Sequence, residues 1–182
     1  MVAHRGAVAG AAAPHLDLDT HISFLVIALS NRISSSATQT YMRHFGVGVM
    51  EWRVLAMLAI EPDITANRIN QVTGVDKAAI SRAVKALVAR RYVKSVGDAD
   101  DSRRSLLSLT AAGRALHDRI VVASFAREAR LAKGLSPEER RTLIRLLKRI
   151  SANVPHVNAY DPSAKTLDPP VFRRTSRRPA RS

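Results

Sequence analysis

The chain has 182 residues, of which 46% are hydrophobic, and this size and composition suit one domain with a buried core. It contains no cysteine, which excludes disulfides, thiolate metal ligands, a cysteine nucleophile and thiol-based redox sensing. The 29 lysines and arginines against 15 acidic residues give a formal net charge of +14, which favours a polyanionic partner such as nucleic acid.

The amino-terminal third is predicted to be a tail followed by two helices. Residues 1–15 are rich in alanine and glycine, as flexible tails are, and lack the apolar core of a signal peptide. The longest apolar run, Phe24–Leu29, is too short to span a bilayer, so we expect a cytoplasmic protein without membrane contact. Apolar residues at helical spacing predict a long helix over Leu16–Phe45 and a second over Val49–Ile60.

The centre of the chain predicts two short helices joined by a tight turn. Thr65 and Asp76 are placed to cap them, and Gly74 permits the turn. The second of these helices has apolar residues on one face and short or cationic residues on the other, namely Lys77, Ala78, Ser81, Arg82 and Lys85. Such a face suits the major groove of DNA, because short side chains allow close approach while hydroxyl and guanidinium groups bond to base edges or phosphates.

Two strands and two further helices are predicted after this motif. The strands are Tyr92–Gly97 and Ser105–Leu109, joined by a turn rich in aspartate. Thr110 is placed to cap a helix that runs to about Lys133, and Gly134 ends it. Ser136 then opens a capping box and a last helix that extends to Ile150.

These elements predict a mostly α fold with a small β-hairpin wing, a winged helix-turn-helix with amino- and carboxy-terminal dimerisation helices. Residues 16–152 form the domain, with a DNA-binding lobe at 49–110 and dimerisation helices at 16–45 and 111–152. Residues 153–182 are basic and rich in proline and arginine, which predicts a disordered tail. The outer helices carry more apolar residues than a small DNA-binding lobe can cover, so we expect a homodimer. The alternative is an intramolecular bundle of these helices.

No motif for catalysis, metal or cofactor binding is found. The six histidines lack the spacing of metal ligands, and the chain has no nucleophile elbow, phosphate loop or dinucleotide-binding glycine motif. The sequence therefore predicts neither an enzyme nor a bound metal or cofactor.

One stretch of sequence resembles a known family. Asp98, Asp101 and Arg103 match the wing pattern of Asp, two residues, Asp, one residue, Arg, and Leu109–Gly113 matches the Leu-Thr-x-x-Gly that follows it. Asp76, Ser81, Arg82 and Leu87 match the recognition-helix pattern of the same family. Over residues 16–152 the chain resembles the MarR family of bacterial transcriptional regulators.

The resemblance implies which residues contact DNA. Ser81, Arg82 and their exposed neighbours would enter the major groove, Arg103 would reach the minor groove from the wing tip, and Asp101 would orient Arg103. The expected DNA-binding residues are Thr65, Lys77, Ala78, Ser81, Arg82, Lys85, Asp101, Arg103 and Arg104. The alternative for the wing is a solvated turn whose surface ion pairs contribute little.

The chain departs from the family pattern at two positions. Arg91 stands where the family usually has a glycine that ends the recognition helix, and this backbone is expected to be left-handed and mildly strained. Ser95 replaces a frequent arginine at the end of the first wing strand, which puts a phosphate contact there in doubt.

Family members often bind a small molecule between the dimer helices and the DNA-binding lobe, commonly an aromatic acid. The resemblance implies polar candidates on the first two helices: His15, His21, Arg43, Trp52 and Arg53. The arginines are equally consistent with surface charges, and Trp52 with a core residue.

The sequence therefore predicts a sequence-specific regulator of transcription. It would be a repressor that binds double-stranded DNA at a pseudo-palindromic operator and is released by a small ligand such as an aromatic carboxylate. Two alternatives stay open, namely an architectural, nucleoid-type protein that binds DNA without sequence preference and a winged domain that docks protein partners.

Overall fold

The computed structural model describes residues 16–97, 105–161 and 163. The chain divides into two compact units, Met1–Ala129 and Arg130–Ser182, which we describe in turn. The fold is mostly α-helical with a two-stranded antiparallel hairpin, as the sequence predicts. The expected amino-terminal tail lies outside the described residues, as does most of the expected carboxy-terminal tail.

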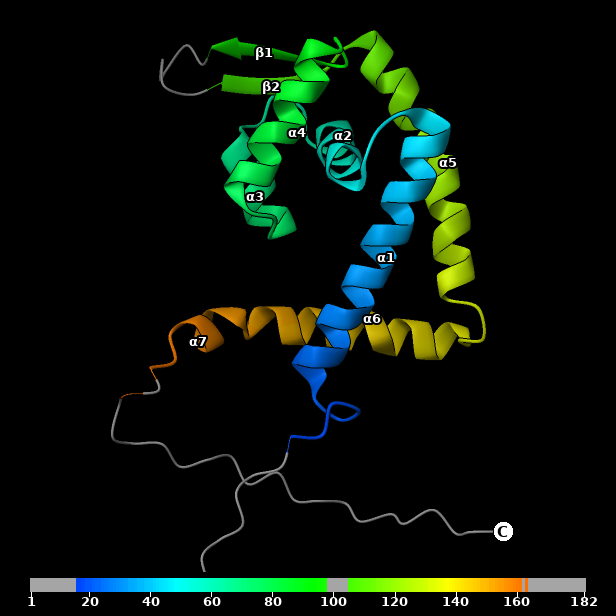
Figure 1. Cartoon of the computed structure of the whole chain (residues 1–182), viewed down its shortest axis with the longest axis vertical. Coiled ribbons are helices and arrows are strands. Elements are labelled where there is room, and N and C mark those ends of the chain that lie inside the picture. The colour runs from blue at the N-terminus through cyan, green and yellow to red at the C-terminus, as the bar shows by residue number, and fades with distance from the viewer. Residues whose placement is uncertain (1–15, 98–104, 162, 164–182) are drawn as a thin grey trace, which may run out of the picture. The chain divides into compact units, whose positions relative to one another are not determined.

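The first unit contains most of the helices and the hairpin, labelled in Figure 1. Its elements are α1 (Ile22–Phe45), α2 (Val49–Ile60), α3 (Ala66–Thr73), α4 (Lys77–Ala89), β1 (Val93–Gly97), β2 (Ser105–Leu109) and α5 (Ala111–Leu131), the last of which ends just past the boundary between the units.

Helix α2 forms the centre of the core. Its side chains Val54, Leu55 and Leu58 are at most 1% exposed. It contacts α1, α3, α4 and β2, and Figure 1 shows it between α4 and α1. Buried residues of the surrounding elements complete the cluster, including Tyr41, Ile69, Leu87, Leu107 and Ile120. The recognition helix and the hairpin are thus both anchored to one apolar centre.

Local hydrogen bonds explain where the helices begin. Thr65 Oγ1 accepts the Arg68 N–H at 3.2 Å, and Asp76 Oδ1 accepts the Ala79 N–H at 2.8 Å. Both caps confirm the sequence prediction. Helix α1 begins at Ile22 rather than Leu16, because the chain first makes a turn at Asp17–Thr20 and His21 then caps the helix. His21 Nδ1 accepts the Phe24 N–H at 3.3 Å.

The hairpin is joined to the loop before α3 at its base. Val93 pairs with Leu109 and Gly97 with Ser105, which fixes the register of β1 against β2. On the other edge of β2, the Leu107 N–H donates to the Ile64 carbonyl at 2.9 Å. The Ser108 hydroxyl also hydrogen-bonds to the Asp63 carboxylate. The base of the wing is therefore held from both sides.

Arg91 has a left-handed backbone, with φ at 59°, as its place in the family's glycine position predicts. This conformation costs a residue with a Cβ about 1 to 2 kcal/mol. Arg91→Gly is therefore expected to raise the free energy of unfolding by up to about 1 kcal/mol, because glycine gains flexibility in the unfolded state that offsets part of the relief. Urea denaturation followed by circular dichroism measures the change.

A matched control introduces glycine at a right-handed helical position. Lys85→Gly in the exposed face of α4 is expected to lower the free energy of unfolding by about 1 kcal/mol. If Arg91→Gly destabilised the protein as much as Lys85→Gly does, strain at Arg91 would be disproved.

The second unit holds the carboxy-terminal helices α6 (Pro137–Ala152) and α7 (Val154–Asn158). The Ser136–Glu139 capping box is formed as predicted: the Ser136 N–H donates to Glu139 Oε2 at 2.7 Å, and Ser136 Oγ accepts the Glu139 N–H at 3.2 Å. These bonds from Ser136 lower the pKa of Glu139 below its ordinary value, because they favour the charged carboxylate.

Helix α7 corrects part of the predicted disordered tail. Residues 154–158 are helical, with Pro155 in the first turn, where its missing N–H leaves no intrahelical bond unmade. A one-turn helix is too short for apolar periodicity to reveal it. Among the helices of the described ranges, none is long and apolar enough to cross a membrane.

Candidate nucleic-acid interface

The outer face of α4 presents cations and small side chains to solvent. Lys77, Ser81 and Lys85 follow one another at four-residue spacing, so they lie in one row, and Ala78 and Arg82 form the adjacent row. All five are exposed, whereas Ile80, Ala83 and Leu87 on the opposite face are buried in the core. Within the described chain no carboxylate pairs with any of the three cations. The positive charge of this face is therefore available to a partner.

The turn before α4 is fixed by hydrogen bonds within the motif. Gly74 is left-handed, with φ at 67°, and its N–H donates to the Asn70 carbonyl at 2.9 Å. Asn70 Nδ2 donates to the Val75 carbonyl across the turn, and the Thr73 hydroxyl donates to the Ile69 carbonyl at 2.7 Å. These bonds fix the angle between α3 and α4, and therefore the orientation of the exposed face of α4.

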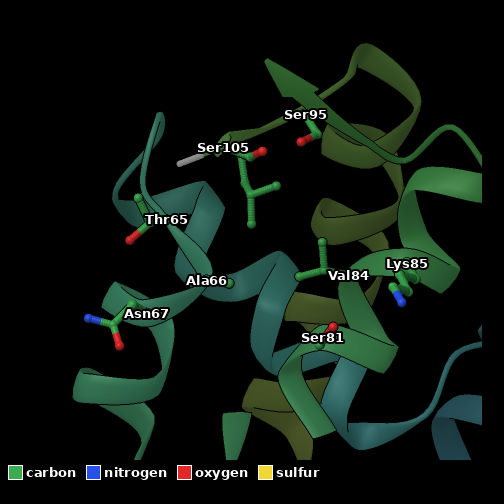
Figure 2. Close-up of a pocket in the computed structure, with 9 residues that line it drawn as sticks. Thr65, Ala66, Asn67, Ser81, Val84, Lys85, Ser95 and Ser105 are labelled. Atoms are coloured by element: carbon green, nitrogen blue, oxygen red, sulfur yellow. The ribbon is translucent and has the colours of Figure 1, made fainter. Parts of the chain in front are cut away.

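The amino terminus of α3 faces a hollow of about 530 Å³ between α3, α4 and the hairpin. Figure 2 shows Thr65 and Asn67 on one side of it, Ser81 and Lys85 on another, and Ser95 and Ser105 on the strands. A helix begins with N–H groups that have no partner within the helix and with partial positive charge, both of which favour anions. Hydroxyls and one ammonium group thus surround a site suited to a phosphate.

Asn67 and Ser105 were missed by the sequence analysis. Asn67 is exposed in the first turn of α3. Its position two residues after the Thr65 cap could have identified it from the sequence as a candidate phosphate contact. Ser105 lines the hollow only because the hairpin folds back over α3, so its sequence position gives no hint of it. Ser95, where the family pattern has a frequent arginine, also lines this hollow.

The wing tip lies outside the described residues. Asp101, Arg103 and Arg104 belong to the interval 98–104, so their expected DNA contacts remain predictions. The two strands that carry the tip are described, and their base is tied to Asp63 and Ile64.

A second cluster gathers aromatic and cationic side chains where α1, α2 and α5 meet. Half-buried Trp52 stacks on His117, with ring centroids 5.5 Å apart, and meets the ring of Tyr41 edge-on at 6.0 Å. His117 Nδ1 lies 2.8 Å from the Asp118 carboxylate, and its side chain is 15% exposed. Trp52 therefore packs against the core and also has polar neighbours. This packing is compatible with both interpretations from the sequence, a core residue and a ligand-binding residue.

Two arginines in this region bond to the hydroxyl-rich middle of α1, and neither has a carboxylate partner within the described residues. Arg53 Nη2 donates to Ser34 Oγ at 3.2 Å. Arg127 donates to Ser36 Oγ and Thr40 Oγ1 at 3.2 to 3.3 Å, and its guanidinium lies 5.7 Å from the Tyr41 ring centroid. Among the residues that the structure describes, the groups bonded to these two guanidinium ions are neutral, an arrangement compatible with an added anion.

The four candidate ligand residues that the structure describes do not come together in one site. His15 is outside the described residues. His21 and Arg43 lie at opposite ends of α1, about 33 Å apart along its axis, so one small ligand cannot reach both. Trp52 and Arg53 are neighbours on α2, and His117 and Arg127 on α5 were missed because only the tertiary fold brings α5 to this place. Among the described residues, no group of three or more histidine and acidic side chains could hold a metal ion.

Comparisons with known proteins agree with this geometry. The family model described as MarR family matches residues 45–104. The HTH-type transcriptional regulator TcaR of Staphylococcus aureus is 32% identical over 102 residues, which cover 54% of this chain and 67% of that protein. The structure of a MarR/EmrR family transcriptional regulator from Acinetobacter sp. ADP1 is 29% identical, with a TM-score of 0.73, over 78% of this chain and 99% of that one.

A further solved structure is similar in fold. BpsR of Bordetella bronchiseptica, whose DNA binding is regulated by 6-hydroxynicotinic acid, is 22% identical with a TM-score of 0.64, over 72% of this chain and 99% of that one. At this identity the likeness shows the fold alone. With the matched recognition motif, the identity to TcaR and the winged helix-turn-helix in place, the chain belongs to the MarR family of DNA-binding transcriptional regulators, whose members are not enzymes.

Proposed function

We propose that this protein is a homodimeric repressor of the cytoplasm that binds a pseudo-palindromic operator and is released from it by a small aromatic carboxylate. The observation that carries the DNA-binding part is the outer face of α4. Five exposed side chains in two rows, three of them cations without a carboxylate partner among the described residues, match what the major groove accepts. Arg82 reads a base edge, and Lys77 and Lys85 bind phosphates.

The hollow beside α4 receives the DNA backbone in this proposal. The N–H groups at the start of α3 and the Asn67 amide bind a phosphate there, and the Thr65 cap keeps that helix end in place. Arg103 at the wing tip enters the adjacent minor groove, supported by Asp101, and Arg104 adds a backbone contact. These assignments account for affinity as well as sequence preference.

The dimer is supported by apolar surface that a single chain leaves exposed. In α1 these residues include Ile22, Phe24, Leu25, Ile27 and Leu29, and in α6 they include Leu143, Ile144, Leu146, Leu147 and Ile150, all 40 to 60% exposed. Patches of this kind are rare on monomers and mark protein interfaces. A second copy covers them, and its recognition helix reads the second half of the operator about 10 base pairs away.

Footprinting on the DNA upstream of its own gene tests the proposed function. A protected inverted repeat with half-sites one helical turn apart is the expected result. Uniform coverage would support an architectural protein, and no binding at moderate salt would support a domain that docks protein partners. Either of these results would overturn the operator proposal.

The ligand is proposed to bind beside Trp52, with its ring against apolar walls and its carboxylate on Arg53. The arginine makes no ion pair among the described residues and bonds to Ser34 Oγ, so a carboxylate offers it a stronger partner. His117, stacked on Trp52, connects this place to α5. A ligand here releases the operator if it binds one dimer geometry more tightly than the other.

Trp52 is the only tryptophan, so its fluorescence reports on this place alone. Titration with small aromatic acids, hydroxybenzoates and hydroxynicotinates included, is expected to change its emission. Arg53→Gln is expected to weaken a binding acid by about tenfold or more, because a charge-assisted hydrogen bond contributes about 1.5 to 3 kcal/mol.

Arg68→Gln serves as the control, because Arg68 is an exposed arginine already paired with Glu61 at 3.0 Å. It is expected to leave the acid's affinity unchanged. Equal affinities in wild type and Arg53→Gln would rule out Arg53 as the carboxylate partner.

A further inference from the structure

Helix α6 carries a second basic surface that the recognition motif does not use. Arg141, Arg145, Lys148 and Arg149 recur at intervals of four, three and one residues, which places them on one face of the helix. We call this set the α6 basic stripe. All four residues are exposed, and with Ile144 and Ala152 they line a shallow groove of about 490 Å³.

The stripe has no ion-pair partner among the described residues, although Glu138 lies three residues before Arg141 on the same helix. None of its four cations takes part in an ion pair there. Nearby Glu139 is engaged by Ser136 in the capping box, and Asp161 accepts hydrogen bonds from Ser163. Like charges one helical turn apart destabilise a helix by a few tenths of a kcal/mol per pair. The stripe therefore costs stability in the isolated chain, and an anionic partner offsets that cost.

Charge balance favours an external polyanion as the partner. A second copy of this chain carries the same +14, so it is a less favourable partner for the stripe than a polyanion is. Most apolar residues of α6 project from a different face, so a dimer that covers them does not need to cover the stripe. From Arg141 to Arg149 the stripe is about 12 Å long, a length over which duplex DNA presents about seven phosphate charges. Three of its four members are arginines, whose planar guanidinium groups bind phosphate in a bidentate manner.

We propose that the α6 basic stripe is a second, sequence-independent DNA contact that binds phosphates outside the operator. It raises affinity for long DNA and for random sequence, whereas α4 selects the operator. The proposal goes beyond operator recognition and does not depend on it, since its readout is binding to random DNA.

The test compares the 182-residue chain with a variant in which all four stripe residues are glutamine: Arg141→Gln, Arg145→Gln, Lys148→Gln and Arg149→Gln. Glutamine favours helices and leaves the apolar face intact, so circular dichroism and size-exclusion elution should match those of the wild type. On a random-sequence duplex the variant is expected to bind more weakly, with a shallower dependence of log affinity on log salt. Removal of one phosphate-binding cation reduces that slope by about 0.9. On a duplex limited to the operator its affinity is expected to be unchanged.

Two controls distinguish an effect of the stripe on the salt slope from an effect of net charge or of side-chain shape. The pair Arg145→Gln and Arg149→Gln should reduce the salt slope more than the pair Arg32→Gln and Lys133→Gln, which removes two exposed cations from outside the stripe. The triple variant Arg141→Lys, Arg145→Lys and Arg149→Lys should retain most of the slope, because lysine also binds phosphate.

Three outcomes would overturn the proposal. The first is an unchanged salt slope on random DNA in the glutamine variant, and the second is an equal reduction of the slope in the two double variants. The third is a membrane contact in place of DNA, seen as weaker binding to vesicles that contain anionic phospholipid with no change on DNA.

Discussion

Gly113→Ala is expected to lower the free energy of unfolding by about 3 kcal/mol or more, at the upper end of what overpacking costs. A Cβ at this position would lie 1.9 Å from the Tyr92 carbonyl oxygen and 2.9 Å from its carbonyl carbon. These atoms cannot give way easily, because the Tyr92 oxygen accepts the Thr110 N–H at 3.0 Å and the Tyr92 N–H donates to the Leu87 carbonyl at 2.9 Å. The methyl group must therefore push α5 away from the end of α4 and the start of β1.

Urea denaturation at fixed protein concentration measures this effect, and the fixed concentration matters because the proposed dimerisation would contribute to stability. Gly97→Ala is the matched control. A Cβ at Gly97 meets nothing within 4 Å, so its effect is expected to stay within about 0.5 kcal/mol. If Gly113→Ala unfolded at the same urea concentration as Gly97→Ala, close packing of α5 on Tyr92 would be refuted. The same contact explains why the Leu-Thr-x-x-Gly pattern ends in glycine.

Arg82→Ala is expected to weaken binding to the operator by about 1 to 3 kcal/mol, or about five- to 150-fold, and binding to random DNA by less. Arg82 is exposed on α4, and its guanidinium makes no ion pair within the described residues. In the proposed complex the variant would lack the two hydrogen bonds that read a base edge, whereas the remaining cations would still bind phosphates. Fluorescence anisotropy on operator and random duplexes measures both affinities.

Arg82→Lys distinguishes base reading from simple charge. Lysine keeps the charge but lacks the planar pair of donors. We therefore expect Arg82→Lys to show most of the decrease in operator affinity seen in Arg82→Ala, with little change in the affinity for random DNA. If Arg82→Lys restored wild-type affinity on both duplexes, Arg82 would be a phosphate contact. Equal decreases on both duplexes in Arg82→Ala would lead to the same conclusion.

Apart from the short helix α7 and the first turns of α1, the sequence alone determined the elements and their order, because their signals are local. Thr65, Asp76 and Ser136 cap helices through bonds to residues three positions away, and Gly74 adopts the turn that only its lack of a Cβ makes easy. The exposed face of α4 also follows from periodicity, since its apolar residues can be buried on one side only. The left-handed Arg91 was predicted by comparison with a family glycine.

Tertiary structure alone decided how these elements combine into sites. Ser105 and Ser95 line the hollow between α3, α4 and the hairpin because β2 pairs with Ile64 across 43 residues of chain. Trp52 stacks on His117, which lies 65 residues further along the chain. The same is true of Arg90 at the end of α4, whose guanidinium donates to the Gly46 carbonyl at 2.8 Å. Such contacts depend on how apolar faces pack around α2, which is a property of the whole core.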